Sequence, residues 1–166
     1  MPARPDLERL AFAPLAVSDA DPAAALHARC FDPPWSAADF RNFAEAPVYS
    51  GLLAWRGEEL AGLLIVMTVG AEIEILTLAV APEARRRGVG SAILRHFLND
   101  AAAAGMEALF LEVGEANCAA RALYEACGFR AIGVRPGYYQ TRDGTENATI
   151  MKIALPAKTP TATAVP

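Results

Sequence analysis

The sequence contains few of the residues that build disulfide frameworks or metal sites. Its three cysteines, Cys30, Cys118 and Cys127, form no Cys-x-x-Cys pair, and their odd number suits free thiols in a reducing compartment. The two histidines, His27 and His96, lack the spacing of metal ligands. We therefore expect a cytoplasmic protein that has no disulfide framework and binds no metal.

Long apolar runs and an excess of basic residues are also missing. No stretch reaches membrane-spanning length, and residues 1–10 carry charges in place of the apolar centre of a secretory signal peptide. The formal net charge of -4 argues against general nucleic-acid binding, because little basic charge lies outside one arginine cluster. We expect no contact with membranes and no direct contact with nucleic acid.

The composition fits one globular domain. Of the 166 residues, 54% are hydrophobic and 20% are charged, which is enough to build a single core. We expect this domain to span residues 1–155, as a monomer or a weak dimer. Residues 156–166 are rich in Pro, Thr and Ala and bury too little apolar surface to offset their ordering entropy, so we predict a disordered tail there.

Changes in hydrophobic period predict an α/β fold with a mixed sheet. Two helices are expected first, from Asp21 to about Cys30 and from a Ser36 cap to about Glu45. An antiparallel meander follows, then a helix, a strand parallel to the meander's last strand, another helix and a hairpin. The later elements are expected at 49–55, 60–69, 73–80, 88–104, 108–113, 117–127, 129–139 and 148–155, with the hairpin loop at 141–147.

The most informative segment joins the third strand to the helix after it. It reads Arg85-Arg86-Arg87-Gly88-Val89-Gly90. The glycines let the backbone approach an anion, the first N–H groups of the helix point at it, and the arginines supply counter-charge. Residue 93 is Ile93, where a dinucleotide fingerprint needs a third glycine, and a P-loop's Gly-Lys-Ser/Thr is absent. The segment predicts a pyrophosphate site, with a basic turn that caps a helix as the alternative.

This order of elements resembles the GCN5-related N-acetyltransferase (GNAT) fold, in which Arg85-x-x-Gly88-x-Gly90 stands as the pyrophosphate motif for acetyl-CoA. The chain is similar in particular to the RimI-type ribosomal-protein-alanine N-acetyltransferases. The motifs that carry this are Pro34-Trp35-Ser36, Leu111-Glu112-Val113, Asn117-x-x-Ala120-x-x-Leu123-Tyr124-x-x-x-Gly128-Phe129, Arg135-x-x-Tyr138-Tyr139 and Glu146-Asn147-Ala148. The resemblance covers residues 30–155 and implies a mixed sheet of six to seven strands, splayed between the fourth and fifth, with helices on both faces.

The resemblance also implies acetyl-CoA as cosubstrate. In the family, the arm of the cofactor pairs like an added strand with the backbone of the strand that ends at Val80. Asn117 either caps its own helix or hydrogen-bonds this arm. The cofactor-binding residues implied in this way are Leu78, Ala79, Val80, Arg85, Arg86, Arg87, Gly88, Val89, Gly90, Ser91, Asn117 and Tyr124.

Acetyl transfer from a thioester to an amine requires a neutral amine, a polarised carbonyl and a proton for the leaving thiolate. The resemblance implies Glu112 as the base, acting directly or through water, at the end of a buried strand where desolvation favours a basic carboxylate. An ion pair with an arginine or a helix cap is the alternative role. Tyr124 is implied as the proton donor, with core packing as the alternative. The Val80 N–H is the candidate to polarise the carbonyl.

The acceptor side rests on aromatic and acidic residues. Trp35, Tyr138 and Tyr139 bring aromatic side chains from two loops, either as walls of a peptide cleft or as hydrophobic lids. Glu74 shares a strand face with Glu72 and is placed to meet a cationic N-terminus, with a solvated sheet edge as the alternative. We count Trp35, Glu74, Tyr138 and Tyr139 as candidate substrate-binding residues.

Two departures from the family bear on the acceptor. The family often has Arg and Ser where this chain has Gly114 and Ala116, and Asp where it has Asn147. The resemblance implies an acetyl-CoA-dependent N-acetyltransferase that acts on a protein α-amine, the N-terminal alanine of a small-subunit ribosomal protein, by direct attack in a ternary complex. A small amine or a lysine side chain as acceptor, or a non-catalytic acetyl-CoA sensor, are the alternatives.

Overall fold

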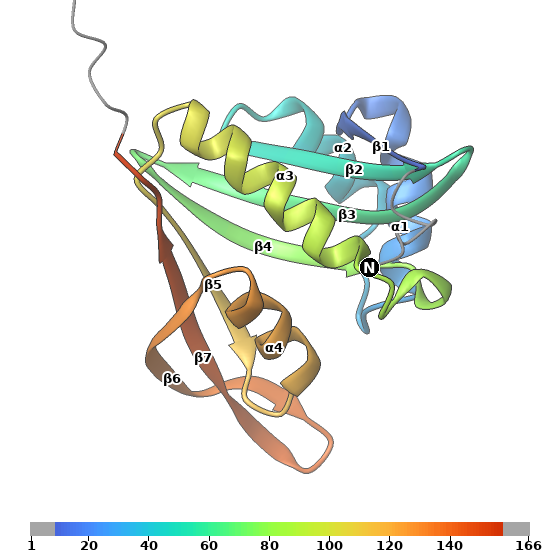
Figure 1. Ribbon diagram of the computed structural model, residues 1–166. Coiled ribbons are helices and arrows are strands. Elements are labelled where there is room, and N and C mark those ends of the chain that lie inside the picture. The colour runs from blue at the N-terminus through green and yellow to red at the C-terminus, as the bar shows by residue number, and fades with distance from the viewer. Residues whose placement is uncertain (1–8, 158–166) are drawn as a thin grey trace, which may run out of the picture.

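Seven strands form one mixed sheet in the order β1-β2-β3-β4-β5-β7-β6 (Figure 1). The computed structural model describes residues 9–157. The strands are β1 (Leu10–Pro14), β2 (Tyr49–Arg56), β3 (Glu59–Val69), β4 (Glu72–Val80), β5 (Ala108–Gly114), β6 (Arg130–Thr141) and β7 (Gly144–Ala154). The helices are α1 (Ala20–Ala28), α2 (Ala37–Glu45), α3 (Val89–Ala103) and α4 (Cys118–Ala126), with 3-10 turns η1 (Val17–Asp19) and η2 (Pro82–Ala84).

The helices lie on both faces of this sheet. In Figure 1, α3 crosses the near face of β2 to β4, while α1 and α2 lie behind it. The apolar stripe of α3 explains its position, because Val89, Ile93, Leu94 and Ala101 are all buried. Helix α2 starts at Ser36 as predicted, since the Asp39 N–H donates to Ser36 Oγ at 3.2 Å and the Ser36 N–H donates to Asp39 Oδ2 at 2.7 Å.

The sheet is splayed between β4 and β5, which confirms the predicted fold class. Among the described strands these two form the one parallel pair, and their ladder runs only from Glu72↔Ala108 to Ile75↔Leu111. Beyond it, β4 continues to Val80 and β5 to Gly114 without pairing, and Figure 1 shows the strands moving apart. A bulge marks the same place, because Ile65 pairs with Thr77 while Val66 pairs with Ile75, which leaves Leu76 as an extra residue.

Most of the predicted elements are confirmed to within two residues. Strand β1, a short strand that pairs with β2 through residues such as Phe12↔Ala54, had not been predicted. The hairpin loop was also placed too widely at 141–147. Thr141 pairs with Gly144, so only Arg142 and Asp143 form the turn and the polar residues after it belong to β7.

Residues 1–8 and 158–166 are not described. The tail predicted at 156–166 therefore lies almost entirely outside the described residues. Among residues 9–157, no helix is both long and apolar enough to cross a membrane.

Candidate active site

A cavity of about 630 Å³ lies where β4 ends and α3 begins. Its walls come from the end of β4, the turn that leads into α3, helix α4 and the segment after α1. It brings together almost all of the predicted cofactor residues. Those that line it are Leu78, Ala79, Val80, Arg85, Arg86, Gly88, Val89, Gly90, Ser91, Asn117 and Tyr124, whereas Arg87 does not.

The turn before α3 has a backbone shape that suits an anion. Gly88 precedes α3 with a φ of 88°, and no side chain caps the helix. Arg86 also has a positive φ, of 60°, which is uncommon for a residue that carries a Cβ. The first N–H groups of α3 have no side-chain cap, and the start of this helix lines the cavity together with Arg85 and Arg86. The turn therefore offers both backbone donors and positive charge to a phosphate group.

Gly90 serves packing at the same place. A Cβ added at Gly90 would lie 3.0 Å from Leu123 Cδ2 and 3.5 Å from Val80 Cγ2. The absence of a side chain thus allows α3 to approach α4 and the end of β4, so the second glycine of the motif closes the cavity wall.

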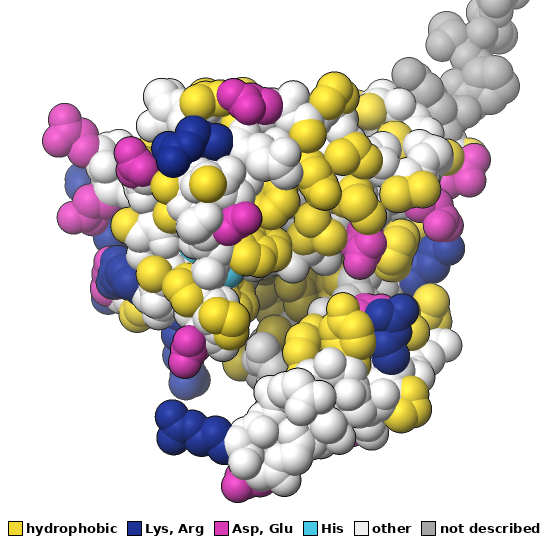
Figure 2. Space-filling view, turned by 180° about the vertical axis from the view of Figure 1, so that it is seen from behind, with side chains coloured by type: hydrophobic (Ala, Val, Ile, Leu, Met, Phe, Trp, Pro, Cys, Tyr) yellow, Lys and Arg dark blue, Asp and Glu magenta, His cyan; other side chains and the backbone are white. Residues whose placement is uncertain are grey.

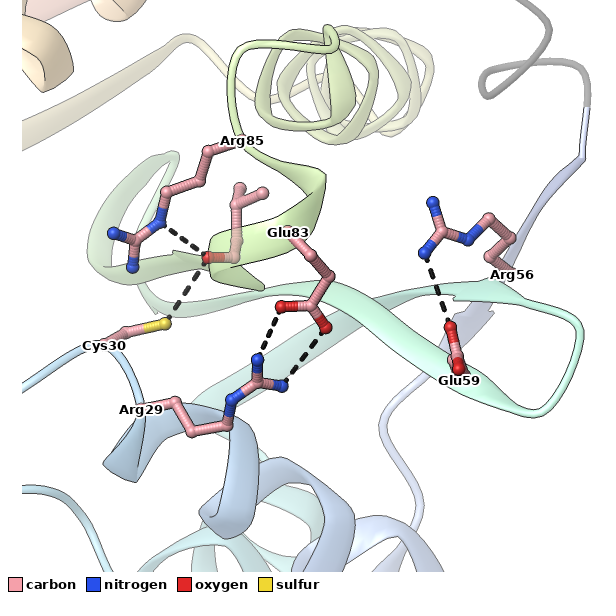
Figure 3. A network of polar contacts seen from close by, with 7 residues as sticks. Arg29, Cys30, Arg56, Glu59, Glu83 and Arg85 are labelled. Atoms are coloured by element: carbon pink, nitrogen blue, oxygen red, sulfur yellow. Dashed lines mark hydrogen bonds and ion pairs between the residues drawn. The ribbon is translucent and has the colours of Figure 1, made fainter.

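Polar contacts hold the surrounding segments against the end of β4 (Figure 3). The Val80 carbonyl accepts a hydrogen bond from Arg85 Nε at 3.0 Å and a weaker one from Cys30 Sγ at 3.5 Å. Arg29, at the end of α1, contacts both carboxylate oxygens of Glu83 in η2, with Nη1 lying 3.3 Å from Oε1. The segment after α1 is therefore tied both to β4 and to η2, which leads into the turn before α3.

A second cavity, of about 390 Å³, opens inside the splay. Its walls come from β4, β5, α4 and the β6–β7 hairpin. Figure 2 shows a hollow in one face of the molecule, with hydrophobic side chains at its floor. The two cavities have five lining residues in common, which are Phe31, Leu78, Asn117, Ala120 and Tyr124. They are therefore adjoining chambers of one groove.

Glu112 lines the second cavity and forms an ion pair with Arg135. The Glu112 side chain is 15% exposed, and Arg135 Nη1 lies 3.1 Å from its Oε1 and 3.3 Å from its Oε2. Tyr139 adds a hydrogen bond from its hydroxyl to the Glu112 carbonyl oxygen, at 3.3 Å. The arginine contact foreseen as an alternative role is thus present, and it fixes the carboxylate at the wall of the cavity.

Tyr124 lies on α4 at the junction of the two chambers. It is 7% exposed and packs edge-on against Phe129, with ring centroids 5.6 Å apart, so it contributes to the core as well as to both cavities. Burial raises the pKa of Tyr124 well above its ordinary value, and the neighbouring Tyr139 and Cys127 raise it further. The phenol therefore stays protonated at neutral pH and is able to act as a proton donor.

Asn117 begins α4 between the same two chambers. Its Oδ1 accepts a hydrogen bond from the Ala120 N–H at 3.2 Å, so it caps the helix. The side chain also lines both cavities.

A model of the Acetyltransferase (GNAT) family matches residues 20–129. The chain belongs to this family. It is 34% identical over 122 residues to the ribosomal protein bS18-alanine N-acetyltransferase of Escherichia coli K12, covering 74% of this chain and 82% of that protein. It is also 35% identical over 141 residues to the N-alpha-acetyltransferase RimI of Mycobacterium tuberculosis, covering 81% and 87% of the two chains. The RimI-type resemblance is thereby confirmed.

Solved structures agree with the assignment. The crystal structure of the E. coli ribosomal-protein-S18-alanine N-acetyltransferase matches with a TM-score of 0.83 at 30% identity, over 92% of this chain and 97% of that one. Arabidopsis thaliana NAA60, with a TM-score of 0.80, 20% identity and coverage of 90% and 99%, shares the fold. The chain is thus a GNAT N-acetyltransferase, an acyltransferase by reaction class.

The GNAT groove does not include every residue predicted for the acceptor. Only Tyr139 lines the second cavity. Trp35 stacks on His27 with ring centroids 4.8 Å apart, and Tyr138 lies under the Arg135 guanidinium at 4.8 Å. Glu74 lines neither chamber. Burial raises the pKa of Glu74 and the nearby Glu112 raises it further, whereas Arg135 lowers it.

Two residues of the groove, Phe31 and Glu146, were not among the predicted site residues. Phe31 is 40% exposed, lines both chambers and stacks on the buried His27 with centroids 4.5 Å apart. The feature of the sequence that could have indicated Phe31 is its position directly before the stiff, proline-containing segment 32–35. Glu146 lines the second chamber from β7, and its signal was its place in the motif Glu146-Asn147-Ala148.

His27, for which no function was predicted, holds the Phe31 segment in place. Its Nδ1 accepts the Trp35 N–H at 3.0 Å, and its Nε2 lies 3.4 Å from Thr77 Oγ1. Burial lowers the pKa of His27, against a smaller opposing effect of Asp39. The imidazole is therefore a neutral link between α1 and β4.

Proposed function

We propose that this enzyme transfers the acetyl group of acetyl-CoA to the α-amine of a protein, the N-terminal alanine of a small-subunit ribosomal protein, by direct attack in a ternary complex. The observation that carries the proposal is the adjoining pair of chambers. Glu112 lines the second chamber, and Tyr124 lines both. The names of the E. coli and M. tuberculosis relatives support the acceptor.

The first chamber fits acetyl-CoA in shape and charge. The uncapped start of α3, with Arg85 and Arg86 beside it, suits the pyrophosphate. Leu78 to Val80 border the chamber along the open edge of β4, where backbone groups suit the extended pantetheine arm. When bound, acetyl-CoA supplies the acetyl group as a thioester. Arabidopsis NAA60, which shares the fold, has been solved with acetyl-CoA.

The residues around the junction divide the proton transfers. Glu112 accepts a proton from the acceptor amine, directly or through water, as the new C–N bond forms. Tyr124 donates its phenolic proton to the sulfur as the C–S bond breaks. The Val80 N–H polarises the acetyl carbonyl. Arg135 and Tyr139 keep Glu112 in place. Glu112 then releases its proton to solvent and Tyr124 takes one up, which completes the cycle.

Free thiols support a cytoplasmic site for this reaction. Cys30, Cys118 and Cys127 are all unpaired in the structure, which suits a reducing compartment.

A panel of acceptors tests the proposal. Peptides with a free N-terminal alanine, the same peptides with the α-amine already acetylated, lysine peptides and polyamines are incubated with acetyl-CoA, and thiol release is measured. We expect turnover of the free α-amines and none of their blocked counterparts. Turnover confined to polyamines or lysine side chains would reject the acceptor. Acetyl-CoA binding without turnover of any acceptor would identify a sensor instead.

A further inference from the structure

The second chamber has an uneven balance of charge. Of the residues that line it, only Glu112 and Glu146 carry a full charge, and neither Lys, Arg nor His is among them. Arg135 compensates Glu112 through the ion pair at 3.1 Å. Glu146 is thus the carboxylate of this chamber that has no cationic partner among residues 9–157.

The Glu146 carboxylate is nevertheless held in place. Its Oε1 accepts the Ala116 N–H at 2.6 Å, across the mouth of the loop between β5 and α4. Gly114 makes room for it, because a Cβ at Gly114 would lie 2.7 Å from Glu146 Oε1 and 3.2 Å from its Oε2. The side chain is partly buried. Its negative charge therefore has a fixed position on the chamber wall.

The position of Glu146 relative to the chemistry is also defined. In the β6–β7 ladder Glu146 pairs with Tyr139, whose hydroxyl bonds the backbone of Glu112. Glu146 thus lines the same chamber as Glu112 and lies beside Gly114, two residues further along β5. From these contacts we infer that Glu146 selects acceptors with a basic side chain, Arg or Lys, at the residue after the N-terminal one. This inference rests on the proposed function and names the acceptor class more narrowly.

The expected interaction is a charge-assisted hydrogen bond between the Glu146 carboxylate and the guanidinium or ammonium group of the acceptor's second residue. Because the site is partly exposed, the expected preference is modest, about three- to tenfold in kcat/KM for a basic over a neutral second residue.

The test uses peptides that begin with alanine and differ only at residue two, which is Arg, Lys, citrulline, Ala or Glu. Citrulline keeps the shape of arginine without its charge. For the wild-type enzyme we expect kcat/KM to be about three- to tenfold higher with Arg than with citrulline, and lowest with Glu. For Glu146→Gln, whose amide oxygen still accepts the Ala116 N–H, we expect the Arg-to-citrulline ratio to fall close to one.

Glu58→Gln is the matched control, because it removes one negative charge from the exposed turn between β2 and β3. Its Arg-to-citrulline ratio should equal that of the wild type. Equal turnover of the Arg and citrulline peptides by the wild-type enzyme would by itself overturn the inference. The proposed transfer to an α-amine would not be affected by that result. An unchanged ratio in Glu146→Gln would overturn it as well. Absence of turnover with every peptide would overturn the proposed function and this inference with it.

Discussion

Gly88 gives the sharpest test of the proposed pyrophosphate site at the turn before α3. Its φ of 88° lies in the left-handed region, and it stands directly before the uncapped start of α3. A residue with a Cβ pays roughly 1–2 kcal/mol in this region. Gly88→Ala must therefore either keep the turn and lose that much folding free energy, or relax the turn and misplace the backbone N–H groups.

Both routes have a measurable result. If the turn is kept, the free energy of unfolding falls by about 1–2 kcal/mol. If the turn relaxes, the same energy appears as about a five- to thirtyfold weaker affinity for acetyl-CoA. If the pyrophosphate binds at this turn as proposed, we expect weaker affinity to dominate in calorimetric titrations, with a fall in thermal stability beside it. The bulkier Gly88→Val should abolish binding.

Gly57→Ala is the matched control. Gly57 has a φ of 62° in the turn between β2 and β3, and an added Cβ there meets nothing within 4 Å. The backbone strain is of the same kind, but Gly57 lines neither chamber. We expect a similar loss of stability with unchanged acetyl-CoA affinity. If both variants bind acetyl-CoA as tightly as the wild type, the pyrophosphate does not lie at this turn.

Three further expectations concern single side chains. Glu112→Gln should lower kcat by about 100-fold or more, measured as thiol release, because the amide cannot accept the proton of the amine; near-normal turnover would remove the assignment. Tyr124→Phe should slow transfer while acetyl-CoA affinity and thermal stability stay close to wild type, because the ring still packs on Phe129; an unchanged rate would refute the proton donor. The folded-state pKa of His27 is lowered, so the unfolded chain binds more protons, and stability should fall as pH drops through the ordinary value of 6.5. Urea titrations at neutral and acidic pH measure this, and His27→Asn, which keeps an acceptor for the Trp35 N–H, should reduce the dependence.

The grouping of residues around the first chamber was predictable because its signals are local. The glycines, the arginines and the start of α3 follow one another in the chain, so their spacing alone defines the turn. Of the predicted residues, only Arg87 fails to line the first chamber. The parallel placement of β4 and β5 was equally accessible, since one helix separates them.

The acceptor side depends on contacts between distant segments, and there the sequence was a weaker guide. Trp35 looked like a cleft wall, yet its stacking partner His27 draws it into the packing of α1 and α2. Arg135 reaches Glu112 from 23 residues away, through a strand register that spacing alone does not define. Glu146 enters the second chamber because Gly114, on another strand, leaves space for it.

The short ladder between β4 and β5 also has a mechanical meaning. Within residues 9–157, its four pairs are the only strand pairing between β1 to β4 and β5 to β7, so the sheet consists of two plates joined along a narrow seam. A ligand lodged in the opening of such a joint works as a wedge that braces both plates. Stiffness of this enzyme should therefore rise with ligand occupancy, and amides of Leu76 to Val80 should exchange with deuterium more slowly once acetyl-CoA is added.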